Sequence, residues 1–232
     1  MFEVPRLKLR PGTGNYSKGQ ARVVEILEAA LDVLLDEGYQ ALTMRRIAKA
    51  CGITVGNVTY YYKSKDDLVR DLLTGVLESY MDIFDHIASD TTKTAEEKFV
   101  TVIRLLLEDI TSKKTTHLFP QLWALSNHDP FIAECVDEMY TGARAVLNRM
   151  IPEINPNLSE EEQKLVALFV SASIEGMTVF AGYNKPWRPH MQQIEGIAAK
   201  SLLDCVKNIT SEDINRFRDK DFSLDDSPSA PK

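Results

Sequence analysis

One stretch decides the fold, and it reads Thr43-Met44-Arg45-Arg46-Ile47-Ala48-Lys49-Ala50-Cys51-Gly52-Ile53-Thr54-Val55-Gly56-Asn57-Val58-Thr59-Tyr60-Tyr61-Tyr62. Four apolar residues take the inward positions, namely Ile47, Ala48, Ile53 and Val58. Gly52 falls where a tight turn between two short helices favours a positive φ. Thr54 is suited to cap the second helix. This layout predicts a helix-turn-helix, whose second helix enters the major groove of DNA.

The outward face of the second short helix suits contact with bases. It carries small, polar or aromatic side chains: Val55, Gly56, Asn57, Thr59 and Tyr60. An asparagine forms bidentate hydrogen bonds to adenine, and a methyl group packs against thymine. Charged and hydroxyl groups flank this face where phosphates would lie, namely Arg45, Arg46, Lys49, Tyr61, Lys63 and Lys65. Any corner of two helices can show apolar and small residues at the inward spacings, so the generic pattern alone leaves both interpretations open.

The remainder of the chain also predicts helices, because apolar residues recur at spacings of three and four. Capping-box signatures begin at Ser17, Ser64, Thr94, Ser159 and Thr210. Asp129-Pro130 adds an N-cap followed by proline. The expected helices are 17–37, 43–50, 54–60, 65–88, 95–113, 116–126, 130–150, 160–182, 190–208 and a weaker one at 211–218. The fold class is therefore all-α.

Composition places the chain among ordinary globular proteins, with 232 residues of which 44% are hydrophobic and 26% charged. No run approaches the roughly 18 to 20 uninterrupted apolar residues of a membrane span. The N-terminus has no apolar core after a basic start, so no secretory signal is expected. Three cysteines, Cys51, Cys135 and Cys205, are too few and too widely spaced for a disulfide framework or a zinc pattern. A location in the reducing cytosol is expected.

The net charge of −7 would by itself argue against a nucleic-acid binder. The charge is unevenly distributed. Residues 1–70 carry 11 Lys and Arg against 8 Asp and Glu, whereas residues 71–232 carry 16 against 26. Residues 1–22 contain five basic side chains and a single acidic one. We expect this basic arm to attract phosphates and the acidic body to be repelled from DNA.

Catalytic and metal-binding patterns are weak. The four histidines, His86, His117, His128 and His190, do not pair with Cys, Asp or Glu at ligand spacing, except for Asp82 with His86. That pair is interpreted as a solvated ion pair. No phosphate loop or nucleophile elbow occurs. The sequence predicts no enzyme, no metal site and no cofactor, and Cys51 is interpreted as a packed small residue.

A longer set of positions is more specific than the inward pattern. It comprises Thr43, Ile47-Ala48, Cys51-Gly52, Ile53, Thr54, Gly56, Tyr60-Tyr61-Tyr62 and Lys65-Asp66-Asp67-Leu68. This set resembles the signature of the TetR family of bacterial transcription regulators. The resemblance implies a three-helix DNA-binding domain joined to a larger helical domain that dimerises and binds a small effector.

Matched to the signature, Thr43, Tyr61 and Lys65 would contact phosphates. Residues expected to face bases are Arg45, Val55, Gly56, Asn57 and Tyr60. The complete predicted DNA-binding set is Thr43, Arg45, Arg46, Thr54, Val55, Gly56, Asn57, Thr59, Tyr60, Tyr61, Lys63 and Lys65. Arg46 occupies a position that is often acidic in the family, so Thr43 lacks its usual capping partner. Thr59, Tyr62 and Cys51 also depart from the usual tyrosine, phenylalanine and alanine.

The larger domain would supply the effector and dimer surfaces. An apolar pocket with a few polar groups is the usual form of a small-molecule site, and a small apolar or amphipathic effector is expected. The predicted effector residues are His117, Trp123, His128, Tyr140 and Met177; the alternative is that most such side chains are simply core. The predicted dimer residues are Phe169, Ser173, Gly176, Met177, Phe180, Ile197 and Leu202. Helix 160–182 is apolar nearly all round, which also fits burial within one subunit.

The predicted organisation is a basic arm (1–16), a helix-turn-helix domain (17–63), an effector and dimerisation domain (64–210), and a short helix with a disordered tail (211–232). The favoured function is a homodimeric repressor in the bacterial cytoplasm, associated with the nucleoid and released from a palindromic double-stranded operator by a small effector. Two alternatives stand beside it. One is a regulator of the same fold controlled without a ligand or by a protein; the other is an all-helical enzyme or scaffold.

Overall fold

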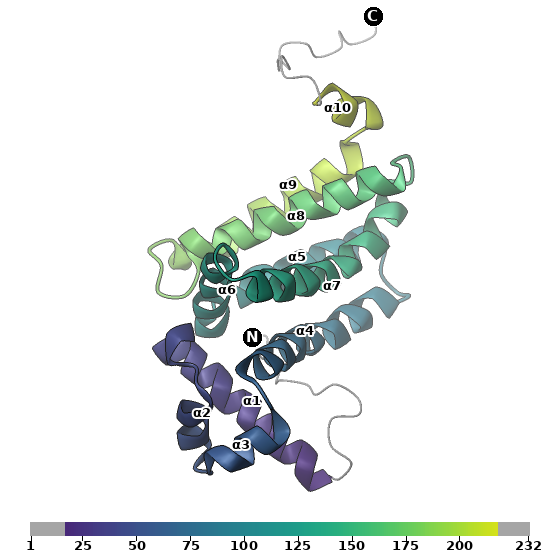
Figure 1. The fold of residues 1–232 in the computed structure, drawn as a ribbon. Coiled ribbons are helices and arrows are strands. Elements are labelled where there is room, and N and C mark those ends of the chain that lie inside the picture. The colour runs from purple at the N-terminus through teal and green to yellow at the C-terminus, as the bar shows by residue number, and fades with distance from the viewer. Residues whose placement is uncertain (1–16, 218–232) are drawn as a thin grey trace, which may run out of the picture.

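The computed structural model describes residues 17–217, and within this range all regular elements are helical (Figure 1). The elements are α1 (Ser17–Glu37), η1 (Tyr39–Ala41), α2 (Met44–Cys51), α3 (Val55–Tyr61), α4 (Lys65–Ser89), α5 (Ala95–Asp109), α6 (Lys113–Ser126), α7 (Pro130–Ile154), α8 (Glu160–Ala181), η2 (Arg188–His190), α9 (Met191–Asn208) and α10 (Ser211–Arg216). The predicted basic arm and the tail beyond residue 217 lie outside the described residues.

Helices α1, α2 and α3 form a small head at one end of the molecule (Figure 1). Gly52 ends α2 at φ 66°, the left-handed conformation that the turn requires. Thr43 and Thr54 cap α2 and α3 by accepting from the backbone N–H groups of Arg46 and Asn57. The predicted helix-turn-helix geometry is confirmed.

The larger domain is built in layers (Figure 1). Helix α4 lies next to the head, α5 and α7 form the middle, and α8 and α9 run side by side on the far side. A Cβ on Gly142 of α7 would lie 2.7 Å from Cδ2 of Leu77 on α4, so the Leu77 side chain would have to shift. The long helix α4 packs on both α1 of the head and α7 of the body.

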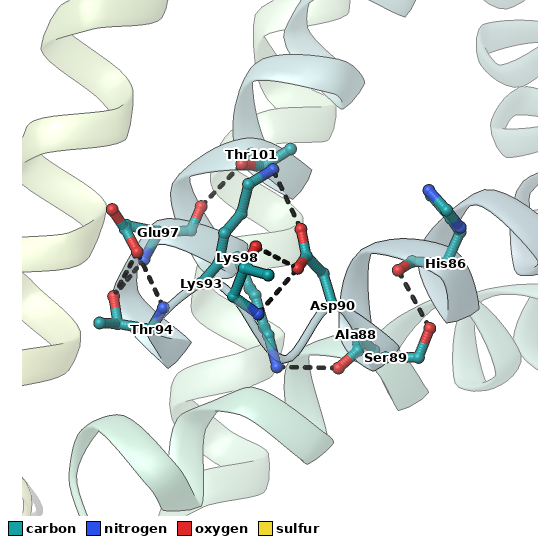
Figure 2. Close-up of polar contacts among 10 residues, drawn as sticks. His86, Ala88, Ser89, Asp90, Lys93, Thr94, Glu97, Lys98 and Thr101 are labelled. Atoms are coloured by element: carbon teal, nitrogen blue, oxygen red, sulfur yellow. Dashed lines mark hydrogen bonds and ion pairs between the residues drawn. The ribbon is translucent and has the colours of Figure 1, made fainter.

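The turn between α4 and α5 is fastened by polar side chains (Figure 2). Thr94 and Glu97 form a reciprocal capping box at the start of α5. The Lys98 ammonium reaches back to the Ala88 carbonyl at 2.9 Å, and Asp90 Oδ1 accepts from the Thr92 N–H at 2.9 Å. These bonds fix the end of α4 that lies farther from the head.

Three predicted boundaries in the body were wrong. Helix α5 ends at Asp109 and α6 begins at Lys113, because Ser112 caps α6 by accepting from the Thr115 N–H at 3.1 Å. Helix α7 continues through Pro152 to Ile154, although a stop was predicted near residue 150. A proline costs a helix one hydrogen bond, and here the packed last turn tolerates it, since Ile151 is fully buried.

Candidate nucleic-acid interface and effector cavity

The outward face of α3 is open to solvent. Tyr60 is 73% exposed and Val55 40% exposed, and Asn57 lies between them in the sequence, also exposed. The Asn57 amide nitrogen donates to Thr54 Oγ1 at 3.0 Å, and Thr59 Oγ1 donates to the Gly56 carbonyl at 3.2 Å. The face thus offers a methyl-bearing side chain, an amide and a phenol to a partner outside the chain.

Gly56 has no structural reason within the protein. It lies in the first turn of α3 with ordinary helical backbone, and a Cβ added there would meet only Thr54 Oγ1 at 3.8 Å. Glycine costs a helix about 1 kcal/mol relative to alanine. We expect the missing side chain at this exposed helical position to permit close approach of another surface, and a DNA groove fits this requirement.

The flanking residues fall into two groups. Thr43, Arg45 and Lys63 are exposed, as is Lys49, whereas Tyr61 is half-buried with its ring 5.1 Å from that of Tyr60. The predicted contacts of this first group to phosphates stay predictions.

Arg46 and Lys65, the second group, are engaged within the chain. The Arg46 guanidinium donates to both carboxylate oxygens of Glu37, at 3.0 and 2.5 Å, and so ties α2 to the end of α1. The Lys65 ammonium lies 3.5 Å from the Tyr39 ring centroid and donates to the Tyr39 carbonyl at 3.3 Å. Both basic groups hold the head together, a role that was not predicted from the sequence.

A small cavity lies in the body between α4, α5, α6, α7 and α8. Its volume is about 50 Å³, room for a few water molecules. Its lining is mostly apolar and aromatic, and includes Val76, Leu77, Tyr80, Phe84, Leu106, Ile110, Phe119, Met139, Tyr140 and Ile174. Asp109, Thr115 and Glu175 add polar groups. An apolar cavity with a few converging polar groups is the usual form of a small-molecule site.

The two acids of the cavity are set in hydrogen-bonded surroundings. Asp109 is 5% exposed, and its Oδ2 accepts from the Tyr80 hydroxyl at 2.7 Å and from Thr115. Burial raises the pKa of Glu175 to about 7; a hydrogen bond from Tyr140 opposes this rise, while the charge of Asp109 adds to it. Asp109 Oδ1 and Glu175 Oε2 are buried without a hydrogen-bond partner.

Of the predicted effector residues, Tyr140 lines the cavity. Trp123 lies behind it and donates from Nε1 to the Tyr140 hydroxyl at 2.9 Å. His128 is exposed at the turn after α6, and Met177 is half-buried against the core, away from the cavity lining. His117 faces the head, as described next. Glu175 was missed, although a single carboxylate within an apolar helical run is a visible signal.

Helix α6 connects the cavity with the head. Its Thr115 and Phe119 side chains line the cavity. Its other side contacts the last turn of α1. There His117 Nδ1 lies 3.2 Å from the Leu35 carbonyl, Gln121 Nε2 donates to the Leu34 carbonyl at 3.3 Å, and Lys113 pairs with Asp36 at 2.6 Å. Helix α6 therefore contacts both the cavity and the carbonyl end of α1.

The outer face of α8 and α9 is apolar and open. Its exposed large side chains are Leu165, Leu168, Phe169, Val179, Phe180 and Ile197, of which Phe180 is 69% and Ile197 67% exposed. Gly176 is also exposed, and a Cβ there would meet nothing within 4 Å. Isolated exposed apolar residues are ordinary, but a continuous group of this kind marks an interaction surface.

One of the predicted dimer residues is corrected, and the others stay predictions. Leu202 is 6% exposed and packs inside its own subunit, because it lies on the inner face of α9 with Ala198 and Ala199. Ser173 and Met177 are half-buried at the edge of the outer face. The all-round apolar pattern of α8 also fitted burial on every side, but one side of the helix is exposed.

Helix α8 passes a test of length and composition for a membrane span, with a mean hydropathy of 1.5 over its most apolar window. A third of that window is buried within the protein. Its buried side carries the Glu175 carboxyl and packs on α7. The core helix of a soluble protein has the same length and composition. Within residues 17–217, no group of three His, Cys, Asp or Glu side chains could hold a metal ion.

The fold and the exposed helix-turn-helix define a DNA-binding regulator with a helical regulatory domain. Residues 26–72 match the profile of the bacterial regulatory proteins of the TetR family, and residues 95–204 match the C-terminal domain of BetI-type transcriptional repressors. The chain belongs to the TetR family and is a DNA-binding transcriptional regulator.

Several relatives share this architecture. The regulator PksA of Bacillus subtilis is 25% identical over 200 residues, covering 81% of this chain and 95% of its own. The FadR structure from Bacillus subtilis in complex with stearoyl-CoA has a TM-score of 0.61 at 19% identity, covering 79% of this chain and 97% of its own. A Saccharomonospora viridis regulator in complex with choline has a TM-score of 0.61 at 18% identity, covering 81% and 96%. At these identities the solved structures show the shared fold.

Proposed function

We propose that the protein is a homodimeric repressor that binds a palindromic operator and is released from it by a small effector in the bacterial cytoplasm. The observation that carries this proposal is the placement of α6, which lines the cavity with Phe119 and contacts the end of α1 with His117 and Gln121. One helix thus joins a candidate ligand site to the DNA-binding head. The complexes of two structural neighbours with stearoyl-CoA and choline support a small-molecule effector.

The outer face of α8 and α9 supports the proposal that the protein dimerises. A single helix of seven residues, α3, makes few base contacts, and two-fold pairing places a second copy of it on the DNA. The apolar face that includes Phe169, Phe180 and Ile197 is suited to pack against its own copy as a four-helix interface. Two recognition helices then read half-sites about 34–36 Å apart.

Release of the DNA would depend on the small volume of the cavity, because an effector has to enlarge it. The cavity is about 50 Å³, well below the hundreds of Å³ of a typical drug-sized pocket. An effector larger than a few waters must displace Phe119 and with it α6. The last turn of α1 then moves, and the spacing of the two α3 helices changes. An effector acts only through such a difference in affinity between two states.

The experiment is a fluorescence-anisotropy titration of the full chain on the DNA upstream of its own gene. We expect binding as one dimer per operator, with affinity falling steeply as salt rises because phosphate contacts release counterions. Tyr61→Phe should weaken binding to all sequences. Lack of any DNA binding at low salt would refute the proposal.

Replacing Gln121 by Leu tests the α6 link. The variant should still bind the operator, but effector-induced release should decline because α6 no longer contacts the Leu34 carbonyl. Asn127→Ala, in the exposed turn after α6, is the matched control. Equal release in the Gln121 variant and the wild type would show that the coupling runs elsewhere.

A further inference from the structure

The cavity holds two carboxyl groups that the protein leaves incompletely bonded. Asp109 ends α5 and Glu175 lies in α8, and both line the cavity. Asp109 Oδ1 and Glu175 Oε2 each lack a hydrogen-bond partner although both atoms are buried. A buried carboxylate oxygen without a donor is costly, so the observation calls for an explanation outside the protein's own hydrogen bonds.

The cavity lining contains two acidic side chains and no basic one. Lys114, on α6, lies 5.7 Å from the centroid of the Tyr80 ring; burial lowers the pKa of its ammonium, and the charge of Asp109 opposes this shift. Arg144 donates to Thr141 at 3.3 Å. The Glu175 carboxyl itself has a pKa raised to about 7 by burial. The cavity therefore keeps an excess of acidic groups over nearby cations.

The aromatic residues that line the rest of the cavity suit a positively charged ligand with an alkyl group. The rings of Tyr80, Phe84, Phe119 and Tyr140 line the cavity. Aromatic faces attract cations through their quadrupole and also bury alkyl groups. The volume of about 50 Å³ accommodates a small polar head before the helices move.

We propose that the effector is an organic ammonium ion with N–H groups, held by Asp109 and Glu175, with its apolar portion against Phe119 and the neighbouring rings. The proposal rests on the proposed function in one respect: the ion is called an effector because the protein is proposed to release DNA on binding it. Binding of the ion in the cavity does not itself require DNA. The N–H groups supply donors to the two unpartnered oxygens, and the positive charge balances the pair. A carboxylate or an acyl anion would meet two acids, and a quaternary ammonium would supply charge without donors.

Binding by such an ion also has a direct route to α6. Asp109 Oδ2 accepts from Thr115, which lies on α6 one turn before Phe119. An alkyl group entering beside the ammonium presses on Phe119. The same helix carries His117 and Gln121 on its α1 side. The residue that bonds Asp109 and the ring that the alkyl group would displace thus both belong to α6.

The test is isothermal calorimetry and thermal melting of the full chain, without DNA, against four matched probes. These are n-butylamine, 1-butanol, butyrate and butyltrimethylammonium. We expect n-butylamine to bind and to raise the melting temperature with concentration. The other three should bind about tenfold or more weakly, because each lacks either the charge or the N–H donors.

Variants locate the site. Glu175→Gln and Asp109→Asn keep the side-chain shape and should each weaken n-butylamine binding about tenfold or more. Glu161→Gln, an exposed position on the same helix α8, is the control and should leave it unchanged. If Asp109→Asn fails to fold, Glu175→Gln alone decides.

Three results would overturn the proposal: butyrate or 1-butanol binding as tightly as the amine, the quaternary ion doing so, or the Glu175 variant binding the amine like the wild type. These failures are separate from failure of the proposed function. A chain that binds operator DNA and is released by a non-cationic compound keeps the function and loses the ammonium effector. A chain that binds the amine in calorimetry but binds no DNA keeps the ammonium site and loses the proposed function.

Discussion

The outward face of α3 and the outward face of α8 with α9 share one feature and differ in the side chains around it. Each carries an exposed helical glycine with no neighbour that requires it, Gly56 in α3 and Gly176 in α8. Around Gly56 the exposed side chains are polar or isolated, whereas around Gly176 they are large and apolar. Glycine inside a helix costs stability. In the proposed function both surfaces are approached closely from outside, α3 by a hydrated polyanion and α8 by an apolar surface.

The two faces also differ in how their neighbours are charged. Arg45, Lys49 and Lys63 flank α3 and are exposed, which is the arrangement expected around phosphates. The first turn of α8 carries Glu160, Glu161 and Glu162, which complements its helix dipole and would repel DNA. The face of α3, flanked by basic residues, and the acidic start of α8 therefore lie in different parts of the molecule.

The largest expected effect comes from a charge placed on the apolar face. Phe180→Glu would bury one unpaired carboxylate per subunit at the proposed interface, at a cost of about 3–5 kcal/mol. The dissociation constant of the dimer should rise by at least about 100-fold, measured by analytical ultracentrifugation. Operator affinity should fall with it, because one α3 alone makes half the contacts.

A control separates interface from folding. Lys200→Gln, at an exposed polar position of α9, should leave the dimer intact, and the far-UV circular dichroism of the Phe180 variant should match that of the wild type. A Phe180 variant that remains dimeric would show that the apolar face has another occupant, and the comparison of the two faces would then fail.

The next effect concerns Glu175 on the buried side of α8. The raised pKa of Glu175, about 7 against an ordinary 4.5, means that the folded state holds a proton that the unfolded state has lost. Its contribution to stability is therefore complete below about pH 4.5 and is lost as the pH rises through 7. The change corresponds to about 3 kcal/mol.

Glu175→Gln should remove this pH-dependent loss of stability, because glutamine does not ionise. The free energy of unfolding of the variant minus that of the wild type should grow between pH 5 and pH 8, as measured by urea denaturation at each pH. Glu161→Gln, which is exposed, should show a constant difference. A constant difference for Glu175→Gln as well would mean that this carboxyl is already ionised and solvated in the fold.

The sequence predicted the head far better than the cavity, for physical reasons. The helix-turn-helix depends on local signals, such as the left-handed Gly52 and the Thr54 cap, which lie within a few residues of the helices they define. The cavity depends on Asp109 and Glu175, which come from separate helices and meet only through packing. Amphipathic character drew the prediction to His117 and His128 instead, but it does not reveal which way a side chain faces.

The dimer face shows the same limit. Helix 160–182 is apolar on both sides, so periodicity could not distinguish its inner from its outer residues. Phe180 and Ile197 lie outward, as an interface requires, whereas Leu202 lies inward. The partner-facing side became visible only once the rest of the chain had covered the other.

Reading of bases by α3 should give a smaller and sequence-dependent effect. Asn57→Ala removes the amide from the exposed face of α3 and should cost about 1–3 kcal/mol on the preferred operator. Its affinity for unrelated DNA should change little, because phosphate contacts remain. Competition titrations with operators altered at single base pairs measure this. An equal loss on all sequences would instead assign Asn57 to capping through Thr54.

The smallest effect is also the most direct test of the comparison, since it makes one substitution on both faces. Gly56→Ala and Gly176→Ala should each raise the free energy of unfolding by up to about 1 kcal/mol, because alanine favours the helix and both sites have room for a Cβ. That gain should be measured by urea denaturation below the dimer dissociation constant. Function should then divide: Gly56→Ala lowers operator affinity and leaves the dimer unchanged, while Gly176→Ala weakens the dimer. If both variants gain stability and neither loses a partner, the exposed glycines have no role in close approach, and the two faces share nothing but a residue type.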